Sequence, residues 1–287
     1  MRNNKRVLVT GADGFVGRAL VKVLTLNDIE VVAIGRDYGD IVEPETFEKF
    51  QDRKIDHVFH LAGRTFVPGS WETPMEYERV NVCGTINVLE FCRKAAASLT
   101  YVSAYVYGEP PALPVSESTA ARPNNPYAMS KLQAEQWCCF YAEHYGIAST
   151  VIRPFNIFGP GQREDFLIPF VIQQVREGKK VVIKDDAPKR DYCYIDDLVR
   201  ALVLAMSQSW EFEIINIGSG ESLSVGEIVS VIQSVAGTDL PVMVLGEQRK
   251  NEIDDVRADI TKAKRLLGWV PKWSFREGIE KIWGDEK

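Results

Sequence analysis

A tyrosine and a lysine stand four residues apart in the segment NNPYAMSKLQAE, residues 124–135. Residues 127–145 have the pattern of a long helix, and residues four apart on a helix share a face. The phenol of Tyr127 and the ammonium of Lys131 would therefore lie side by side. A free tyrosine has a pKa of about 10, and a neighbouring ammonium stabilises the phenolate and lowers that value. Alone, this spacing is equally typical of surface pairs on helices.

A serine adds a third group to this pair. Ser103 ends the apolar run LTYVS, which predicts a buried strand. In parallel sheets, ligands collect beyond the carboxyl ends of the strands. Ser103 and the start of the Tyr127 helix are therefore expected to converge there, where the serine hydroxyl would hydrogen-bond a reacting oxygen.

Three glycines follow the first predicted strand in VTGADGFVG. Gly11, Gly14 and Gly17 form a G-x-x-G-x-x-G pattern between that strand and an amphipathic helix. Such glycines allow a tight turn, the approach of a pyrophosphate to the backbone, and close packing of helix on strand. The pattern also occurs in turns without a ligand, but its position between a strand and a helix favours dinucleotide binding.

The end of the second predicted strand bears on the choice of dinucleotide. An acidic residue there binds the ribose 2′-hydroxyl of NAD, whereas an arginine accommodates the 2′-phosphate of NADP. The sequence has AIGRD, so Gly35 and Arg36 occupy this place and Asp37 comes one residue late. NADP(H) is favoured and NAD(H) stays open, since Arg36 could equally be a solvated loop residue.

The elements that must position these residues alternate along the chain. Predicted strands lie near 6–10, 29–35, 56–63, 99–104 and 148–154, and predicted helices near 15–28, 44–51, 74–97 and 127–145. This alternation predicts a parallel sheet with helices on both faces. Beyond residue 154, helices are expected at 166–177, 224–236 and 259–267, with a lone strand near 179–184 and a late strand of the main sheet near 214–217. These later segments predict a small second lobe.

Composition excludes several classes of protein. The 287 residues are 45% hydrophobic and 26% charged, and the net charge of −6 includes no block of like charges. A nucleic-acid-binding face is therefore not expected. No apolar run reaches the ~18 residues of a membrane span, and no signal peptide precedes the first strand. The five cysteines lack metal-ligand spacing, which predicts reduced thiols, no metal and a cytoplasmic protein.

Together these motifs resemble the extended short-chain dehydrogenase/reductase family of nucleotide-sugar epimerases, dehydratases and reductases. The resemblance covers nearly the whole chain and includes HLAG, NVCGT, RPFNIFGPGQ, RDYCYIDD, NIGSGE and ADITKAKRLLGW. It implies a Rossmann-type, doubly wound parallel sheet with a discontinuous C-terminal substrate lobe. The expected cofactor domain covers 1–154 plus about 190–217, and the expected substrate lobe covers about 155–189 and 218–287.

The resemblance also implies site residues. Ser103, Tyr127 and Lys131 would be the catalytic trio. The cofactor contacts would be Gly11, Gly14, Phe15, Val16, Gly17, Arg36, Asp40, Ile41, Leu61, Ala62, Gly63, Tyr127, Lys131 and Pro154, with Asp40 and Ile41 beside the adenine. The contacts to a nucleotide-diphosphate sugar would be Thr65, Ser103, Asn156, Arg190, Tyr192, Arg249 and Glu252. Arginine suits phosphate oxygens, although Arg190 and Arg249 could also be surface charges.

Departures from the family pattern narrow the reaction. Dehydratases of this family resemble one another in an Asp-Glu pair directly after the catalytic serine or threonine, and decarboxylating members keep the glutamate. Here these positions are Ala104 and Tyr105, so both reactions lack their acid or base. A reductase of a nucleotide-linked 4-keto-6-deoxyhexose in deoxysugar biosynthesis is favoured. A 4-epimerase is the alternative, and a non-catalytic NAD(P)-binding protein on the same fold is a second one. The resemblance further implies a homodimer formed through a four-helix bundle.

Overall fold

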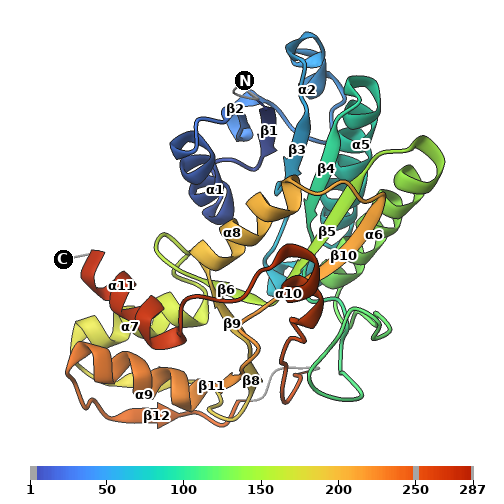
Figure 1. Ribbon diagram of the computed structural model, residues 1–287. Helices are drawn as coiled ribbons and strands as arrows, with labels where there is room; N and C mark the ends of the chain where they lie inside the picture. Colours follow the sequence, from blue (N-terminus) through green and yellow to red (C-terminus); the bar gives the residue numbers. More distant parts are fainter. Residues whose placement is uncertain (1–4, 248–251, 286–287) are drawn as a thin grey trace. The chain divides into compact units, whose positions relative to one another are not determined.

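A computed structural model describes residues 5–247 and 252–285 of the chain. Its contacts divide the chain into two compact units (Figure 1). Unit 1 comprises Met1–Gly108, Thr119–Pro154 and Val199–Ile215. Unit 2 comprises Glu109–Ser118, Phe155–Leu198 and Asn216–Lys287. The assignment of a cofactor domain and a substrate lobe to parts of the chain stays a prediction.

A six-stranded sheet forms the centre of unit 1, in the order β10-β5-β4-β3-β1-β2. The strands are β1 (Arg6–Thr10), β2 (Glu30–Ile34), β3 (His57–His60), β4 (Ser98–Val102), β5 (Ser149–Pro154) and β10 (Phe212–Ile217). The register pairs Thr10 with both Ile34 and His60, and His60 with Tyr101. Since these pairings are parallel, the carboxyl ends of β1, β2, β3 and β4 lie at one edge. The predicted α/β fold with a parallel central sheet is confirmed.

Helices cover both faces of this sheet. The α-helices that lie wholly in unit 1 are α1 (Phe15–Leu26), α2 (Glu45–Glu48), α3 (Val67–Glu72), α4 (Pro74–Tyr77), α5 (Gly84–Ala95) and α6 (Pro126–Tyr145), with 3-10 turns at Arg36–Tyr38 and Gln51–Arg53. From β1 the chain moves to one side of the sheet, and from β3 to β4 and β5 it moves to the other. Right-handed crossovers then place α1 on one face and the adjacent α5 and α6 on the opposite face (Figure 1).

The long helix expected over 74–97 is interrupted. A π-helix, η3 (Glu78–Cys83), joins α4 to α5, and the helix ends at Ala95. A π-turn inserts a residue into an otherwise helical pattern, and such turns occur frequently at functional sites. The apolar spacing of this segment is close to that of a continuous helix, so the sequence pattern did not reveal the interruption.

Helix α6 has clear start and stop signals. The side chain of Asn125 accepts a hydrogen bond from the Ala128 N–H, and Pro126 occupies the first helical position. Gly146 ends the helix in the left-handed region at φ 68°. These residues set the bounds of the helix, so that the Tyr127–Lys131 segment begins in its first turn.

The described part of unit 2 contains three small strand pairs and four helices. Its paired strands are β6 (Asn156–Phe158) with β9 (Tyr192–Tyr194), β7 (Val181–Ile183) with β12 (Val242–Val244), and β8 (Lys189–Arg190) with β11 (Leu223–Ser224). Its helices are α7 (Leu167–Glu177), α9 (Val225–Ala236), α10 (Thr261–Leu267) and α11 (Phe275–Asp285), whereas α8 (Ile195–Met206) spans the division. The predicted helices at 166–177, 224–236 and 259–267 are confirmed to within two residues. Within the described ranges, no helix has the length and apolar character needed to cross a membrane.

One buried carboxylate organises the loops of unit 2. Asp191 accepts hydrogen bonds from the backbone N–H groups of Ser219, Gly220 and Ala258, and from the Ser219 hydroxyl. The residues on either side of Asp191 are the predicted substrate contacts Arg190 and Tyr192. The carboxylate therefore holds this predicted substrate strand against two distant loops.

Candidate active site

The glycines of the loop between β1 and α1 let neighbouring backbone segments lie closer than a side chain would allow. Gly11 has φ 68°, and a Cβ there would lie 2.7 Å from the Ala62 nitrogen. A Cβ on Gly17 would lie 2.0 Å from the Gly11 carbonyl oxygen. Helix α1 begins at Phe15 after Gly14, and no side chain caps it. Backbone N–H groups at an uncapped helix start suit a pyrophosphate, so Gly14, Phe15, Val16 and Gly17 fit a dinucleotide.

The residues that follow β3 lie against this loop. The Leu61 and Ala62 N–H groups donate to the backbone oxygen and the hydroxyl of Thr10, at 3.3 and 3.2 Å. A Cβ on Gly63 would lie 2.9 Å from the Asn81 amide oxygen. The structure thus brings Leu61 and Ala62 to the glycine loop, and Gly63 lies against Asn81.

A carboxylate from another segment of the chain lies at the end of β2, where the sequence itself has Gly35 and Arg36. Asp13, from the glycine loop, accepts a hydrogen bond from the Arg36 N–H at 3.3 Å. A Cβ on Gly35 would lie 3.2 Å from the same carboxylate oxygen. The side chain of Arg36 is exposed. A carboxylate therefore lies against the backbone where the adenosine ribose is expected, and the sequence pattern had revealed only the arginine.

The two residues expected beside the adenine differ in exposure. Asp40 is exposed and accepts from Arg79 at 3.0 Å. Ile41 is buried in the core, where a Cβ on Gly84 would lie 2.6 Å from its side chain. Asp40 is accessible for a ligand, whereas most of the Ile41 side chain is already covered.

Helix α6 brings Lys131 to the end of β4, directly before the predicted catalytic serine. Lys131 Nζ donates to the Val102 carbonyl at 2.6 Å and lies 4.3 Å from the centre of the Tyr101 ring. Ser103, directly after Val102, is buried. Tyr127 lies one turn before Lys131, is half-buried, and packs edge-on against Tyr77.

The protein's own groups do not lower the pKa of Tyr127. Burial, and then the neighbouring Tyr77, raise the pKa of the Tyr127 phenol. Burial lowers the pKa of Lys131 to about 7, against an opposing contribution from Glu135. The groups of the protein alone therefore do not produce the expected lowering of the Tyr127 pKa. Burial has the largest effect on this pKa and raises it, and Lys131, with a pKa of about 7, carries its charge in only about half of the molecules at pH 7. Tyr127 is set up as a phenol that holds its proton.

A chain of hydrogen bonds runs beneath the loop from His60. The Thr85 hydroxyl donates to the Asn81 carbonyl, so it accepts from His60 Nε2. His60 Nδ1 then accepts from the Thr10 hydroxyl at 2.7 Å. Burial, and then Lys131, lower the pKa of His60 to about 3, so the ring is neutral. Its role is to tie β1, β3 and η3 together.

Three further polar residues were missed by the sequence analysis. The Asn81 side chain accepts from the Arg64 N–H and donates to the Arg64 carbonyl and the Ser130 hydroxyl. Glu135 and Arg153 form a buried ion pair at 2.5 Å. The signals were available: Glu135 continues the Tyr127–Lys131 face by one more turn, and Arg153 is a charge within an apolar strand, which implies a buried partner.

The remaining expected substrate and cofactor residues divide between the units. In unit 1, Thr65 lies exposed in the loop before α3, and Pro154 ends β5. In unit 2, Asn156 pairs with Tyr192 in the β6–β9 ladder. Arg190 donates to the Ile253 carbonyl and forms an ion pair with Glu252. Arg249 lies outside the described residues.

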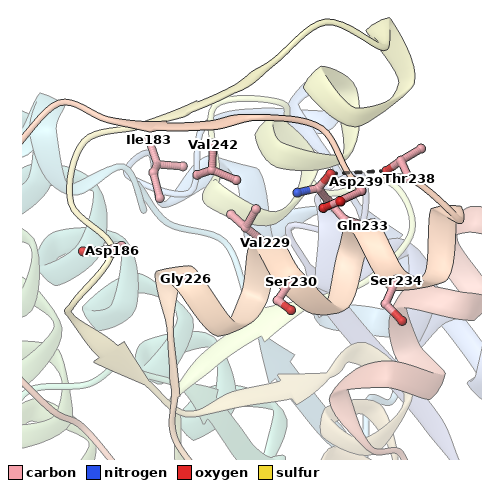
Figure 2. Close-up of a pocket in the computed structure, with 10 residues that line it drawn as sticks. All are labelled: Ile183, Asp186, Gly226, Val229, Ser230, Gln233, Ser234, Thr238, Asp239 and Val242. Atoms are coloured by element: carbon pink, nitrogen blue, oxygen red, sulfur yellow. Dashed lines mark hydrogen bonds between the residues drawn. The ribbon is translucent and has the colours of Figure 1, made fainter.

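A cavity of about 440 Å³ in unit 2 contains none of the expected site residues (Figure 2). It lies along α9 and the β7–β12 pair and is lined by Ile183, Asp186, Gly226, Val229, Ser230, Gln233, Ser234, Thr238, Asp239 and Val242. The amide of Gln233 is committed to Leu240 and Thr238. The residues that line this cavity include no combination like that of Ser103, Tyr127 and Lys131 in unit 1.

Comparison with known proteins gives one family. The model of the NAD dependent epimerase/dehydratase family matches residues 7–218. GDP-6-deoxy-D-mannose reductase of Pseudomonas aeruginosa is 29% identical over 98% of this chain and 97% of that protein. UDP-glucose 4-epimerase of Lactobacillus helveticus is 30% identical over 93% of this chain and 92% of that protein.

Solved structures are similar over nearly the whole chain. UDP-glucose 4-epimerase of Thermotoga maritima with UDP-glucose has a TM-score of 0.92 at 28% identity, covering 98% of this chain and 99% of that one. RMD of Pseudomonas aeruginosa complexed with NADPH has a TM-score of 0.91 at 28% identity and 98% of each chain. The Thermus thermophilus UDP-glucose 4-epimerase complex with NAD has a TM-score of 0.88 at 29% identity, covering 96% and 97%.

Proposed function

Because this chain belongs to the NAD dependent epimerase/dehydratase family, whose members here act on nucleotide sugars, we propose that it reduces a nucleotide-linked 4-keto-6-deoxyhexose. The reaction would resemble that of the GDP-4-keto-6-deoxy-D-mannose reductases in deoxysugar biosynthesis. The observation that carries the proposal is the half-buried phenol of Tyr127 one turn before Lys131, whose ammonium donates to the Val102 carbonyl at the end of β4, in the same unit as the glycine loop.

Each member of the trio has a role in this proposal. The nicotinamide, when bound, supplies the hydride for the C4 carbonyl. Tyr127 donates its proton to the oxygen as negative charge develops there. Lys131 is placed to hold the nicotinamide ribose and to stabilise the phenolate that remains. Ser103 orients the reacting oxygen by a hydrogen bond.

The positions after Ser103 argue against elimination or decarboxylation. Ala104 is buried and has no acid or base. The Tyr105 hydroxyl donates to the Gly108 carbonyl at 2.7 Å. A dehydratase needs a group that moves protons at C5 and C6 of the hexose, and neither side chain suits that task. Hydride transfer at C4 is the chemistry that the remaining groups support.

The cofactor is a nicotinamide dinucleotide. Whether its adenosine ribose carries a 2′-phosphate or a 2′-hydroxyl is part of the proposal. Arg36 favours the 2′-phosphate of NADP(H). The carboxylate of Asp13, which accepts a hydrogen bond from the Arg36 N–H, would repel that phosphate. The related structures carry NADPH in one case and NAD in another. We propose NADP(H) with NAD(H) as a competing cofactor, and a comparison of NADPH and NADH binding tests this preference.

The nucleotide diphosphate would be bound by residues of unit 2. Asn156 and Tyr192 are neighbours across the β6–β9 pair, and the fork of Arg190 suits phosphate oxygens. Glu252 partly neutralises Arg190 and fixes its orientation. We assign Thr65 and Arg249 to the same substrate from the family resemblance alone.

A 4-epimerase is the second candidate, since relatives and similar structures of this chain bear that name. A non-catalytic dinucleotide-binding protein is a weaker third, because the tyrosine and the lysine are both present. A panel of GDP-, UDP-, dTDP- and CDP-linked 4-keto-6-deoxyhexoses and hexoses separates them. Stoichiometric loss of reduced cofactor supports the reductase. Interconversion of C4 epimers without net cofactor use would replace it by the epimerase, and cofactor binding without turnover would support the third candidate.

A homodimer in the cytoplasm completes the proposal. Helix α6 buries Ala134, Cys138 and Ala142 on one side, yet Trp137 and Phe140 are 38% and 42% exposed on another. A helix that is apolar on more than one face usually has a partner on each. We propose that α5 and α6 pair with the same helices of a second copy.

A further inference from the structure

The carboxylate of Asp13 lies where an NAD site usually has its ribose-binding acid, but it comes from a different segment of the chain. Asp13 belongs to the glycine loop, and its Oδ2 accepts a hydrogen bond from the Arg36 N–H at 3.3 Å, directly after β2. The Ala12 N–H, from the same loop, donates to the Ile34 carbonyl at 3.1 Å. Two hydrogen bonds therefore hold Asp13 at the carboxyl end of β2.

Gly35 leaves room for this carboxylate. A Cβ at position 35 would lie 3.1 Å from the Asp13 Cγ and 3.2 Å from Oδ2. Carbon atoms that are not bonded to each other prefer a separation of about 3.5–4.0 Å. An acidic side chain on Gly35 would therefore crowd Asp13. The chain has no acid at the end of β2 itself, and the glycine loop supplies one in that place.

The hydrogen bond to Arg36 leaves Asp13 able to bind a ligand. A carboxylate has two oxygens with about four lone-pair sites, and Asp13 is exposed. A ribose 2′-hydroxyl has a hydrogen to donate to such an oxygen. A 2′-phosphate has negative charge and acceptor oxygens, which a carboxylate repels. The same group therefore favours NAD(H) and disfavours NADP(H).

Arg36 has the opposite preference at the same strand end. Its hydrogen bond to Asp13 is made by the backbone N–H, so that contact does not use the guanidinium. The side chain is exposed, and its planar fork suits the oxygens of a 2′-phosphate. An acceptor for a hydroxyl and a cation for a phosphate are thus offered side by side.

We propose that Asp13 is a specificity-determining residue that recognises the 2′-hydroxyl of the adenosine ribose and makes NAD(H) a usable cofactor beside NADP(H). The inference rests on the cofactor part of the proposed function and deepens it. Arg36 binds the 2′-phosphate of one dinucleotide, and Asp13 binds the 2′-hydroxyl of the other. The glycine loop then sets the choice of cofactor together with the end of β2.

Calorimetric titration of the full chain with NAD⁺ and with NADP⁺, in the absence of any sugar, tests this role. Asp13→Asn removes the charge and keeps an oxygen for the Arg36 N–H. It should weaken NAD⁺ binding, because a charged acceptor bonds about twice as strongly as a neutral one, and tighten NADP⁺ binding, because the repulsion is gone. The ratio of the two Kd values should move about tenfold toward NADP⁺. Arg36→Gln should move it in the opposite direction.

Asp37→Asn is the matched control. Asp37 follows Arg36 directly, is exposed, and loses the same charge in this variant. Its ratio of Kd values should stay within about twofold of the wild type, since only Asp13 contacts the ribose in this proposal. A ligand that lacks the 2′-hydroxyl gives a second readout. The wild type should bind 2′-deoxy-NAD⁺ about tenfold more weakly than NAD⁺, whereas Asp13→Ala should bind both ligands alike.

Two results would overturn the inference alone: equal shifts in Asp13→Asn and Asp37→Asn, or equal binding of NAD⁺ and 2′-deoxy-NAD⁺ by the wild type. A wild type that binds neither NAD⁺ nor NADP⁺ would overturn the cofactor part of the proposed function and the inference with it. Because no sugar takes part, the titrations give the same answer for a reductase and for a 4-epimerase.

Discussion

The buried environment of Lys131 disfavours the charged form of its side chain. It is almost fully buried, donates to the Val102 carbonyl, and lies over the Tyr101 ring. Burial lowers the pKa of Lys131 from 10.5 to about 7. The unfolded chain therefore binds one more proton than the folded chain between about pH 7 and pH 10.5, so this residue makes the free energy of unfolding rise with pH in that window.

The Lys131→Met variant should lose this dependence. At about 1.4 kcal/mol per pKa unit, the shift corresponds to roughly 5 kcal/mol of destabilisation that is fully present below about pH 7. The lost hydrogen bond to Val102 offsets about 1 kcal/mol of the gain. Urea unfolding of the variant should therefore give a higher free energy at pH 7 and a flatter profile up to about pH 10. The exposed Lys22→Met serves as control, and parallel profiles for wild type and Lys131→Met would contradict the assignment.

At the scale of single elements, the π-helix η3 holds a loop of the site. It turns Asn81 toward Arg64, whose backbone N–H and carbonyl both bond to the Asn81 amide. The same amide donates to the Ser130 hydroxyl at 2.9 Å, on the turn of α6 that carries Lys131. One side chain therefore links the segment after β3 to the catalytic helix.

Removing that side chain should loosen the loop. Asn81→Ala deletes three hydrogen bonds in a buried place, and each unsatisfied partner costs about 1–3 kcal/mol. We expect the Arg64 amide to exchange hydrogen at least tenfold faster, together with a lower melting temperature. Asn87→Ala is the matched control, because it removes two hydrogen bonds, to Ile41 and Val42, from the neighbouring helix. Unchanged Arg64 exchange in Asn81→Ala would refute the link.

The elements themselves were largely predictable, and their side-chain partners were not. Short apolar runs predicted the parallel strands, which are buried on both faces, and helical spacing predicted the helices α6, α7 and α9, because burial of one face imposes that period. Tyr127 and Lys131 were predicted as site residues from their spacing on one helix, and Ser103 from its place at the end of a strand. Asp13 at the end of β2 and Arg153 on Glu135 are contacts between residues far apart in sequence. Such contacts depend on the register of the sheet and on the packing of α6. A local sequence pattern predicts neither of these.

At the scale of the whole molecule, the exposed aromatic face of α6 predicts self-association. Trp137 and Phe140 pack edge-on on this face beside His144, and the Tyr141 hydroxyl of α6 donates a hydrogen bond to Glu90 of α5. A charge placed there would be buried in a dimer without a partner. Sedimentation velocity should therefore show a dimer for the wild type and a monomer for Phe140→Asp.

Phe170→Asp provides the control for this prediction. Phe170 lies on α7 in unit 2 and is 43% exposed, nearly the same as the 42% of Phe140. Its replacement should leave the dimer intact. A monomeric wild type, or dissociation by both variants alike, would remove the α5–α6 interface from the proposal.

The central claim is that the Tyr127 phenol gives its proton to a sugar carbonyl while a nicotinamide reduces it. Single-turnover oxidation of bound NADPH by GDP-4-keto-6-deoxy-D-mannose measures this step directly when wild type is compared with Tyr127→Phe. The account predicts that the variant binds NADPH normally and reduces the ketone about 10²- to 10⁴-fold more slowly. Reduction by Tyr127→Phe at close to the wild-type rate would contradict it.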